Sequence, residues 1–200
     1  MGLMKLLGLT GGVGMGKTVI ARFLGGYGAQ IMDTDELARQ FVEPGQPALD
    51  EIRTTFGENI IVPDGRLRRD ELARIIFADP AARKKLETIL HPRIRERWLS
   101  QVGTWRGENR PLAVVAIPLL YETQAESNFD KIICVACSAA TQRQRLLDRG
   151  WSPEQIRQRL AAQWPIEQKI TRSDFLIWTE GALDVSNRQV ERLLAVLCQD

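Results

Sequence analysis

Short apolar runs alternate with amphipathic segments along the chain, in the order expected of an α/β protein. Five such runs predict strands, at residues 5–9, 29–32, 112–117, 131–137 and 175–178. The third and fourth runs are almost continuously apolar, which is typical of a parallel sheet that is covered on both faces. The pattern therefore predicts an α/β fold built on a five-stranded parallel sheet flanked by helices.

Helical spacing of apolar residues fills the intervals between these runs. Residues 18–25 predict a first helix, which Gly25 and Gly26 close. Four further helices are expected before the third run, over residues 34–42, 48–56, 68–77 and 81–105. Turn-forming Pro, Gly and Asp residues separate them. An all-helical insertion, at about residues 36–105, is thus expected to interrupt the sheet.

Two more helical segments follow the fourth run. The first, residues 139–170, is polar and carries five arginines: Arg143, Arg145, Arg149, Arg157 and Arg159. The second, residues 184–197, has apolar side chains at helical spacing. We expect this last helix to pack on the sheet.

Length and charge fit one domain that acts on a small molecule. The chain has 200 residues and a net charge of +2, with 27 basic and 25 acidic residues interspersed, which does not suggest a nucleic-acid partner. Its apolar runs are far shorter than the ~20 residues of a membrane-spanning helix, and its first residues lead straight into a strand, leaving no room for a signal peptide. We expect a cytoplasmic protein with no membrane partner, as a monomer or small homo-oligomer.

Three cysteines, Cys134, Cys137 and Cys198, form an odd set with no disulfide framework, as expected in a reducing compartment. Cys134 and Cys137 fall in one predicted strand, where residues three apart face opposite sides. We therefore expect buried thiols rather than a metal or redox pair.

A glycine-rich segment joins the first strand to the first helix and contains Gly11, Gly12, Val13, Gly14, Met15, Gly16, Lys17 and Thr18. Glycines let successive backbone N–H groups converge on phosphates at angles and distances that a Cβ would block. Lys17 is expected to reach the terminal phosphates, and the Thr18 hydroxyl to bind Mg²⁺. The positive end of the following helix points at the same place. The segment predicts a nucleoside-triphosphate site, with a plain glycine-rich turn as the alternative.

Asp33 and Asp35 follow the second strand, at the edge where open α/β sheets bind ligands. A hydroxyl that accepts a phosphoryl group must be aligned and must lose its proton, and a nearby carboxylate can do both. Asp33 is therefore the candidate catalytic base. The alternative is that Asp33 or Thr34 caps the next helix, and Asp35 is open between a cap and a role towards substrate or Mg²⁺.

Cations that close over the developing charge also favour phosphoryl transfer. Arg145 and Arg149 lie one helical turn apart in the arginine-rich segment and are the candidates. We interpret the other arginines there as a solvated face. His91, the only histidine, has no second ligand with which to form a metal site, so it reads as structural or surface.

Taken together, these motifs resemble the dephospho-coenzyme A kinase family over nearly the full chain. The resemblance rests on six segments: residues 9–18 (LTGGVGMGKT), 33–35 (DTD), 42–45 (VEPG), 90–92 (LHP), 117–122 (IPLLYE) and 159–163 (RLAAQ). It implies a single P-loop kinase domain that transfers the γ-phosphate of ATP to the ribose 3′-hydroxyl of dephospho-coenzyme A, the last step of coenzyme A synthesis. It also implies that the helical insertion holds the acceptor and that residues 139–170 form an arginine-rich lid.

The resemblance further assigns roles to individual residues. Lys17 and Thr18 would serve ATP and Mg²⁺, Asp33 would take the acceptor proton, and Arg145 and Arg149 would neutralise phosphates as the lid closes. Three residues match family motifs near the acceptor and would form a pocket wall: His91, Pro118 and Leu119.

One segment departs from the family pattern. Where the family usually has Asp-Asn-x-Gly near the nucleotide base, this chain has Trp178, Thr179, Glu180 and Gly181. The adenine contacts are therefore left open by the resemblance.

Two other functions remain as alternatives. A small-molecule P-loop kinase for another hydroxyl or phosphate acceptor would share the same nucleotide site. A nucleotide-dependent switch of the GTPase type needs Asn-Lys-x-Asp and Asp-x-x-Gly, and neither occurs in the sequence.

Overall fold

The computed structural model describes residues 4–197 of the chain and divides it into two compact units. One unit holds the described residues up to Asp33 and from Val102 onward, and the other holds residues 34–101. The sheet and the glycine-rich segment belong to the first unit. The second unit begins two residues before the start of the predicted insertion, 36–105, and ends four residues before its end.

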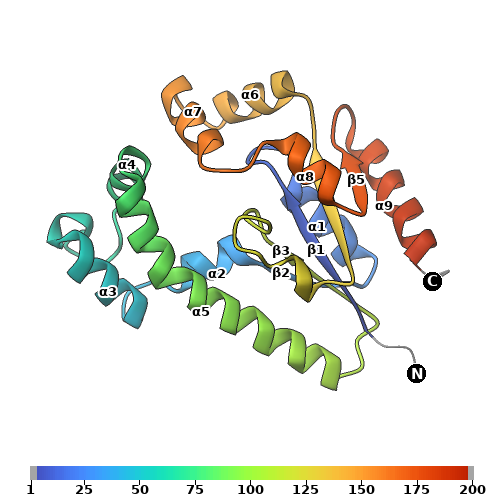
Figure 1. The fold of residues 1–200 in the computed structure, drawn as a ribbon, viewed down its shortest axis with the longest axis horizontal. Coiled ribbons are helices and arrows are strands. Elements are labelled where there is room, and N and C mark those ends of the chain that lie inside the picture. The colour runs from blue at the N-terminus through green and yellow to red at the C-terminus, as the bar shows by residue number, and fades with distance from the viewer. Residues whose placement is uncertain (1–3, 198–200) are drawn as a thin grey trace. The chain divides into compact units, whose positions relative to one another are not determined.

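The first unit is built on a parallel sheet (Figure 1). Within residues 4–197 its strands are β1 (Lys5–Gly11), β2 (Gln30–Asp33), β3 (Leu112–Ala116), β4 (Lys131–Ala136) and β5 (Phe175–Trp178). Their order across the sheet is β2-β3-β1-β4-β5, and all neighbouring strands run parallel. The predicted five-stranded parallel sheet is confirmed.

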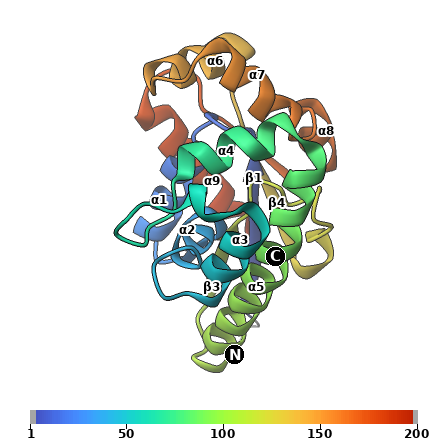
Figure 2. The ribbon, with the colours of Figure 1, turned by 90° about the vertical axis from the view of Figure 1, so that its left-hand side faces the viewer.

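Helices cover both faces of this sheet. Those of the first unit are α1 (Lys17–Gly26), α6 (Ala139–Asp148), α7 (Pro153–Ala161), α8 (Ile166–Arg172) and α9 (Leu183–Leu197). α1 and α9 contact each other and pack on one face of the sheet, whereas α8 contacts β1 and β4 from the opposite face (Figures 1 and 2). A short 3-10 helix, η2 (Glu126–Asn128), precedes β4.

Both faces of β1 are buried, and each face restricts which residue types fit there. Leu7 and Leu9 are fully buried in a cluster with side chains of α1 and α9. Burial of each leucine contributes about 1.5–3 kcal/mol relative to exposure. Gly8 faces the other way, and a Cβ there would lie 2.8 Å from Cδ1 of Leu120. β1 is the central strand of the sheet, and the glycine on its second face leaves room for Leu120 to pack there.

The second unit is mainly helical and has a core of its own. It contains α2 (Thr34–Gln40), α3 (Pro47–Phe56), the 3-10 helix η1 (Glu58–Ile60), α4 (Arg69–Ala78) and most of α5 (Pro80–Gly107). Its buried cluster comprises Val42, Ala48, Leu49, Ile52, Ile60, Leu72 and Ile89. The four predicted helices are present, but an antiparallel bridge between Ile61 and Leu67 corrects the all-helical expectation. None of the helices in residues 4–197 could cross a membrane, since none is both long and apolar enough.

Gly11 marks the point where β1 ends and the glycine-rich segment begins. Its φ is +140°, and a Cβ at this position would lie 2.1 Å from the carbonyl oxygen of Val135 in β4. Side chains rarely adopt this φ, and the nearest atom belongs to backbone that is fixed in the sheet. The position therefore requires glycine on two independent grounds.

We predict that Gly11→Ala lowers the free energy of unfolding by roughly 1–3 kcal/mol, through backbone strain and overpacking. The matched control is Gly26→Ala at the end of α1, where no atom lies within 4 Å of the added Cβ and φ is ordinary. This control should be neutral or slightly stabilising, since Ala favours helix over Gly. Urea denaturation of both variants measures the difference, and equal stabilities would contradict this account of the close approach.

Candidate nucleotide and acceptor site

The phosphate loop, residues 11–18, connects β1 to α1. Gly14 and Gly16 have positive φ values of 78° and 93°, which favour glycine. Nζ of Lys17 donates hydrogen bonds to the carbonyl oxygens of Gly11 and Gly12, at 2.9 and 3.1 Å. The lysine thus lies over the loop whose ligand it is predicted to bind.

α1 presents an uncompensated positive end to this loop. Its N-cap is Gly16, which has no capping side chain, and its first turn contains no acidic residue. The helix dipole and the unpaired N–H groups of a first turn attract anions. The hydroxyl-bearing Thr18 lies in this turn and is exposed. The positive end of α1 therefore faces the loop that is predicted to bind phosphate.

Two glutamines of the arginine-rich segment hold the phosphate loop. Gln142, buried in α6, donates from Nε2 to the carbonyl oxygen of Val13 at 2.7 Å. Gln163, just after α7, accepts from the N–H of Val13 at 3.1 Å. α6 and α7 lie beyond the carboxyl ends of β1 and β4 (Figures 1 and 2). Sequence reasoning missed both contacts, although Gln163 closes one of the motifs quoted above.

The arginines of this segment have different surroundings. Arg145 is half-buried and donates to Thr179 twice, from Nη1 to Oγ1 at 3.1 Å and from Nη2 to the carbonyl oxygen at 2.6 Å. Arg149 follows the last residue of α6 and is exposed. Arg157 pairs with Glu154 on the surface. Because the Thr179 hydroxyl also donates to the carbonyl oxygen of Met15 at 2.8 Å, Thr179 connects Arg145 to the phosphate loop.

Arg143 and Arg159 complete this set. Arg143 is exposed, as expected of a solvated face. Arg159 instead places its guanidinium 4.0 Å from the ring centre of Trp151, a cation–π geometry. The solvated-face interpretation thus fits Arg143 and Arg157 better than Arg159.

Asp33 ends β2 at the same edge of the sheet as the phosphate loop. It lies level with Ala116 of β3, which lies level with Leu9 of β1, two residues before Gly11. Two strand spacings make the separation between Asp33 and Leu9 roughly 10 Å. Asp33 is half-buried there. The strand order therefore brings the candidate base and the candidate phosphate site to one edge.

Two other predicted site residues belong to the second unit. Asp35 is exposed in the first turn of α2, a helix that begins at Thr34. His91 is half-buried in α5, and this burial lowers its pKa. Their roles towards the acceptor stay predictions.

An ion pair lies next to Pro118 and Leu119, the residues predicted to form the wall of the acceptor pocket. Pro118 and Leu119 follow β3, and the carbonyl oxygen of Pro118 accepts from Nζ of Lys169 at 2.7 Å and from the hydroxyl of Thr10 at 3.3 Å. Lys169 is fully buried in α8 and pairs with Glu122 at 2.7 Å. Lys169 therefore links Pro118 to α8. Because Thr10 directly precedes the phosphate loop, this link lies close to that loop.

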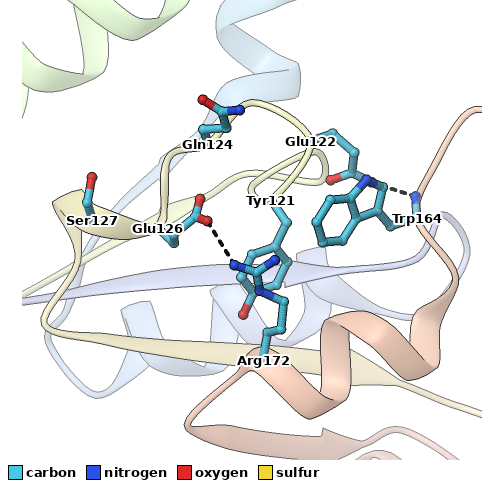
Figure 3. Close-up of a pocket in the computed structure, with 7 residues that line it drawn as sticks. All are labelled: Tyr121, Glu122, Gln124, Glu126, Ser127, Trp164 and Arg172. Carbon is cyan, nitrogen blue, oxygen red and sulfur yellow. Dashed lines mark hydrogen bonds and ion pairs between the residues drawn. The ribbon is translucent and has the colours of Figure 1, made fainter.

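A cavity of about 570 Å³ opens next to this ion pair (Figure 3). Its lining residues are Tyr121, Glu122, Gln124, Glu126, Ser127, Trp164 and Arg172. The rings of Tyr121 and Trp164 stack with centres 6.0 Å apart, and the guanidinium of Arg172 lies 5.3 and 5.4 Å from them. Arg172 also pairs with Glu126 at 3.3 Å. Sequence reasoning did not find this aromatic and charged surface.

The β5–α9 loop, residues 179–182, anchors the start of α6. The carboxylate of Glu180 accepts from the Ser138 N–H at 2.9 Å, the Ser138 hydroxyl at 2.7 Å and the Thr141 hydroxyl at 2.6 Å. These hydrogen bonds lower the pKa of Glu180 to about 2. The Ser138 hydroxyl in turn caps α6 by accepting from the Thr141 N–H. Glu180 thus fixes the first turn of the helix that carries Gln142 and Arg145.

Cys134 lies in β4 and Cys137 just after it, where Cys137 packs against Met15 of the phosphate loop. Cys134 and Cys137 are buried free thiols, as predicted, and burial raises the pKa of Cys134 to about 11. Cys198 lies outside the described residues. Across residues 4–197, the His, Cys, Asp and Glu side chains form no cluster of three that could hold a metal ion.

A glycine-rich loop between β1 and α1 of a parallel sheet, with a carboxylate on the same edge, is the arrangement of the P-loop nucleotide-binding fold. Solved P-loop kinases share this fold, among them shikimate kinase from Acinetobacter baumannii, with a TM-score of 0.53 at 14% identity, covering 98% of this chain and 94% of that one. Residues 5–184 match the model of the dephospho-CoA kinase family. The chain belongs to this family.

Individual relatives agree over nearly the whole chain. Dephospho-CoA kinase of Anaeromyxobacter dehalogenans is 42% identical, covering 97% of this chain and 92% of its own. That of Synechococcus elongatus is 44% identical, covering 95% and 91%. The crystal structure of TT1252 from Thermus thermophilus matches with a TM-score of 0.81 at 31% identity, covering 98% and 99%.

We predict that Lys169→Met lowers the free energy of unfolding by about 3–5 kcal/mol, because the largely buried carboxylate of Glu122 would lose its cation and keep only the hydrogen bond from the Trp164 N–H. Adding Glu122→Gln should restore part of this loss. The control is Lys131→Met, which breaks an exposed pair with Asp174 and should cost at most about 1 kcal/mol. Urea denaturation measures all three, and a Lys169→Met loss no larger than that of the control would contradict a stabilising buried pair.

A pH dependence follows from Glu180. Its folded-state pKa of about 2 lies below the ordinary value of 4.5, so its carboxylate stabilises the fold above about pH 4.5, and this contribution is lost as the pH falls towards 2. Glu180→Gln should therefore be less stable than the wild type at pH 7, with a difference that shrinks below pH 4.5. Urea unfolding across this range measures the difference. A constant difference down to the lowest pH would show that the carboxylate charge is not responsible.

Proposed function

We propose that this chain transfers the γ-phosphate of ATP to the ribose 3′-hydroxyl of dephospho-CoA, giving CoA and ADP in the final step of CoA synthesis. The observation that carries the proposal is that the phosphate loop and Asp33 lie at the same edge of the sheet, in a chain of the dephospho-CoA kinase family. The wider class, a P-loop kinase for another hydroxyl or phosphate acceptor, is the second candidate because it shares this edge.

The phosphate loop would hold the triphosphate of ATP. Its backbone N–H groups and the positive end of α1 would bind the β and γ phosphates, with Lys17 as a charged ligand of the terminal ones. The exposed hydroxyl of Thr18 fits a Mg²⁺ that arrives with ATP. When bound, this ion neutralises charge on the β and γ phosphate oxygens. Arg145 and Arg149 would add positive charge from the lid, residues 139–170.

Asp33 would act on the acceptor. Its carboxylate would accept a hydrogen bond from the 3′-hydroxyl and take the proton as that oxygen attacks the γ-phosphorus. A new O–P bond forms while the bond between the γ-phosphorus and the β–γ bridging oxygen breaks, and ADP leaves with that oxygen. Little else is required of the protein than alignment and charge stabilisation.

The remaining assignments complete the proposal. The insertion at about residues 36–105 would hold the acceptor, with Asp35, His91, Pro118 and Leu119 as contacts. We place the protein in the cytoplasm, which suits the free thiols Cys134 and Cys137. It needs no nucleic-acid or membrane partner for this reaction, and both a monomer and a small homo-oligomer are compatible with it.

The test is product analysis with purified protein, ATP and Mg²⁺. ADP release and product mass are recorded for dephospho-CoA, adenosine, nucleoside monophosphates and shikimate as separate acceptors. Gain of one phosphate by dephospho-CoA alone is the expected result. Turnover with a different acceptor would support the second candidate and overturn the first.

In the same assay, Asp33→Asn should lower kcat by ~10²-fold or more, because the amide cannot take the proton. Its affinity for ATP should stay near that of the wild type, since Asp33 is not part of the phosphate loop. Lys17→Ala is the matched comparison, and should weaken ATP binding along with turnover. Undiminished activity of Asp33→Asn would remove Asp33 as the base.

A further inference from the structure

Thr179 is a buried polar residue in contact with two parts of the proposed phosphate site. Only 6% of its surface is exposed. Its hydroxyl donates to the carbonyl oxygen of Met15 in the phosphate loop at 2.8 Å, with the carbonyl oxygen of Ala136 a longer second acceptor at 3.3 Å, and it accepts from Nη1 of Arg145 at 3.1 Å. One oxygen atom therefore joins the loop to the lid arginine.

The hydrogen-bonding capacity of a hydroxyl explains this arrangement. A threonine hydroxyl has one donor and two acceptor lone pairs. Donation to Met15 points the lone pairs away from the loop, where Arg145 can use them. The branched Thr side chain is stiff about χ1, so the direction of the hydroxyl is largely fixed by the backbone.

The backbone of Thr179 is itself held firmly. Its N–H donates to the carbonyl oxygen of Ala136 at the end of β4, at 2.8 Å. Its carbonyl oxygen accepts from Nη2 of Arg145 at 2.6 Å, so the guanidinium is gripped by two groups of one residue. A bond to each Nη fixes the plane of the guanidinium as well as its position.

Thr179 also packs directly against the loop. A Cβ placed on Gly16 would lie 3.3 Å from its Oγ1, so the loop backbone and the threonine are in close contact. Gly16 directly precedes Lys17 and forms the N-cap of α1. A displacement of Thr179 would therefore also displace the N-terminal end of α1, where the phosphates are proposed to bind.

We propose that Thr179 is a positioning residue for phosphoryl transfer, whose hydroxyl holds the guanidinium of Arg145 in register with the phosphate loop. This inference rests on the proposed function, which gives Arg145 its role towards the transferring phosphate. Thr179 acts through Arg145 and the loop and touches no reacting atom. Loss of this contact should lower kcat more than it raises KM, because the position of the Arg145 charge matters most in the transition state of phosphoryl transfer.

The test compares Thr179→Val with Thr179→Ser under saturating ATP and dephospho-CoA. Valine keeps the shape but removes the hydroxyl, and a hydrogen bond to a charged group is worth roughly 10- to 100-fold. We expect kcat to fall by that factor in Thr179→Val, with the KM for ATP changed less. Thr179→Ser, which keeps the hydroxyl, should restore kcat to within about threefold of the wild type.

A matched control and a folding check accompany these variants. Thr171→Val removes an exposed hydroxyl that bonds only to the Glu167 carbonyl within α8, and it should leave kcat unchanged. Thermal unfolding shows whether each variant is folded at the assay temperature. If Thr179→Val does not fold, Thr179→Ala takes its place, because it removes the hydroxyl without adding an apolar atom against Met15.

A double-mutant cycle with Arg145→Ala separates positioning from a merely structural role. If Thr179 acts through Arg145, the loss caused by Thr179→Val should largely disappear in the Arg145→Ala background. An equal loss in both backgrounds, or wild-type kcat in Thr179→Val, would overturn the inference while leaving the proposed function intact. No turnover of dephospho-CoA by the wild type would overturn the proposed function and this inference with it.

Discussion

The close approach of Gly11 to Val135 is the constraint on which the site depends. The register of β1 with β4 places these two residues opposite each other, and the carbonyl oxygen of Val135 leaves no room for a Cβ. The chain can therefore leave β1 at this point only through glycine, at φ +140°. The phosphate loop and the direction of α1 follow from this exit. β4 in turn continues into Ser138 and α6, so the phosphate loop and α6 start from neighbouring strands.

Buried polar contacts then join the parts that the sheet brings together. Gln142 and Gln163 satisfy both backbone groups of Val13, and Thr179 links Met15 to Arg145. Buried polar groups are costly unless every partner is present, so such contacts specify one arrangement of the phosphate loop and α6. Hydrophobic burial stabilises the sheet, whereas these hydrogen bonds position the phosphate loop and Arg145 relative to each other.

The sequence revealed the parts of this structure that depend on local patterns. Apolar runs located the strands because both faces of the sheet are covered, and the glycines located the phosphate loop because only glycine fits its backbone. Asp33 could be placed near the loop from a rule of topology, that ligands bind at the carboxyl edge of an open sheet. The order of the strands then confirmed that both lie at this edge.

The contacts that the sequence did not reveal join residues far apart in the chain. Nothing near Lys169 indicates that its partner is Glu122, and Gln142 lies 129 residues from Val13. From the sequence, Lys169 could not be distinguished from the other polar residues of its helical segment, although it is fully buried. Arg145 was predicted from the chemistry of phosphoryl transfer, but its hydrogen-bond partner, Thr179, lies in a loop that departs from the family pattern. Long-range hydrogen bonds of this kind leave no periodic signal.

The most direct test of the account is a crystal structure with a non-hydrolysable ATP analogue and dephospho-CoA bound together. The account predicts the triphosphate on the N–H groups of the phosphate loop, and the ribose 3′-oxygen within hydrogen-bond distance of the Asp33 carboxylate. That oxygen should lie in line with the γ-phosphorus and the β–γ bridging oxygen. A 3′-oxygen placed away from Asp33, with another group poised to take its proton, would contradict the central claim.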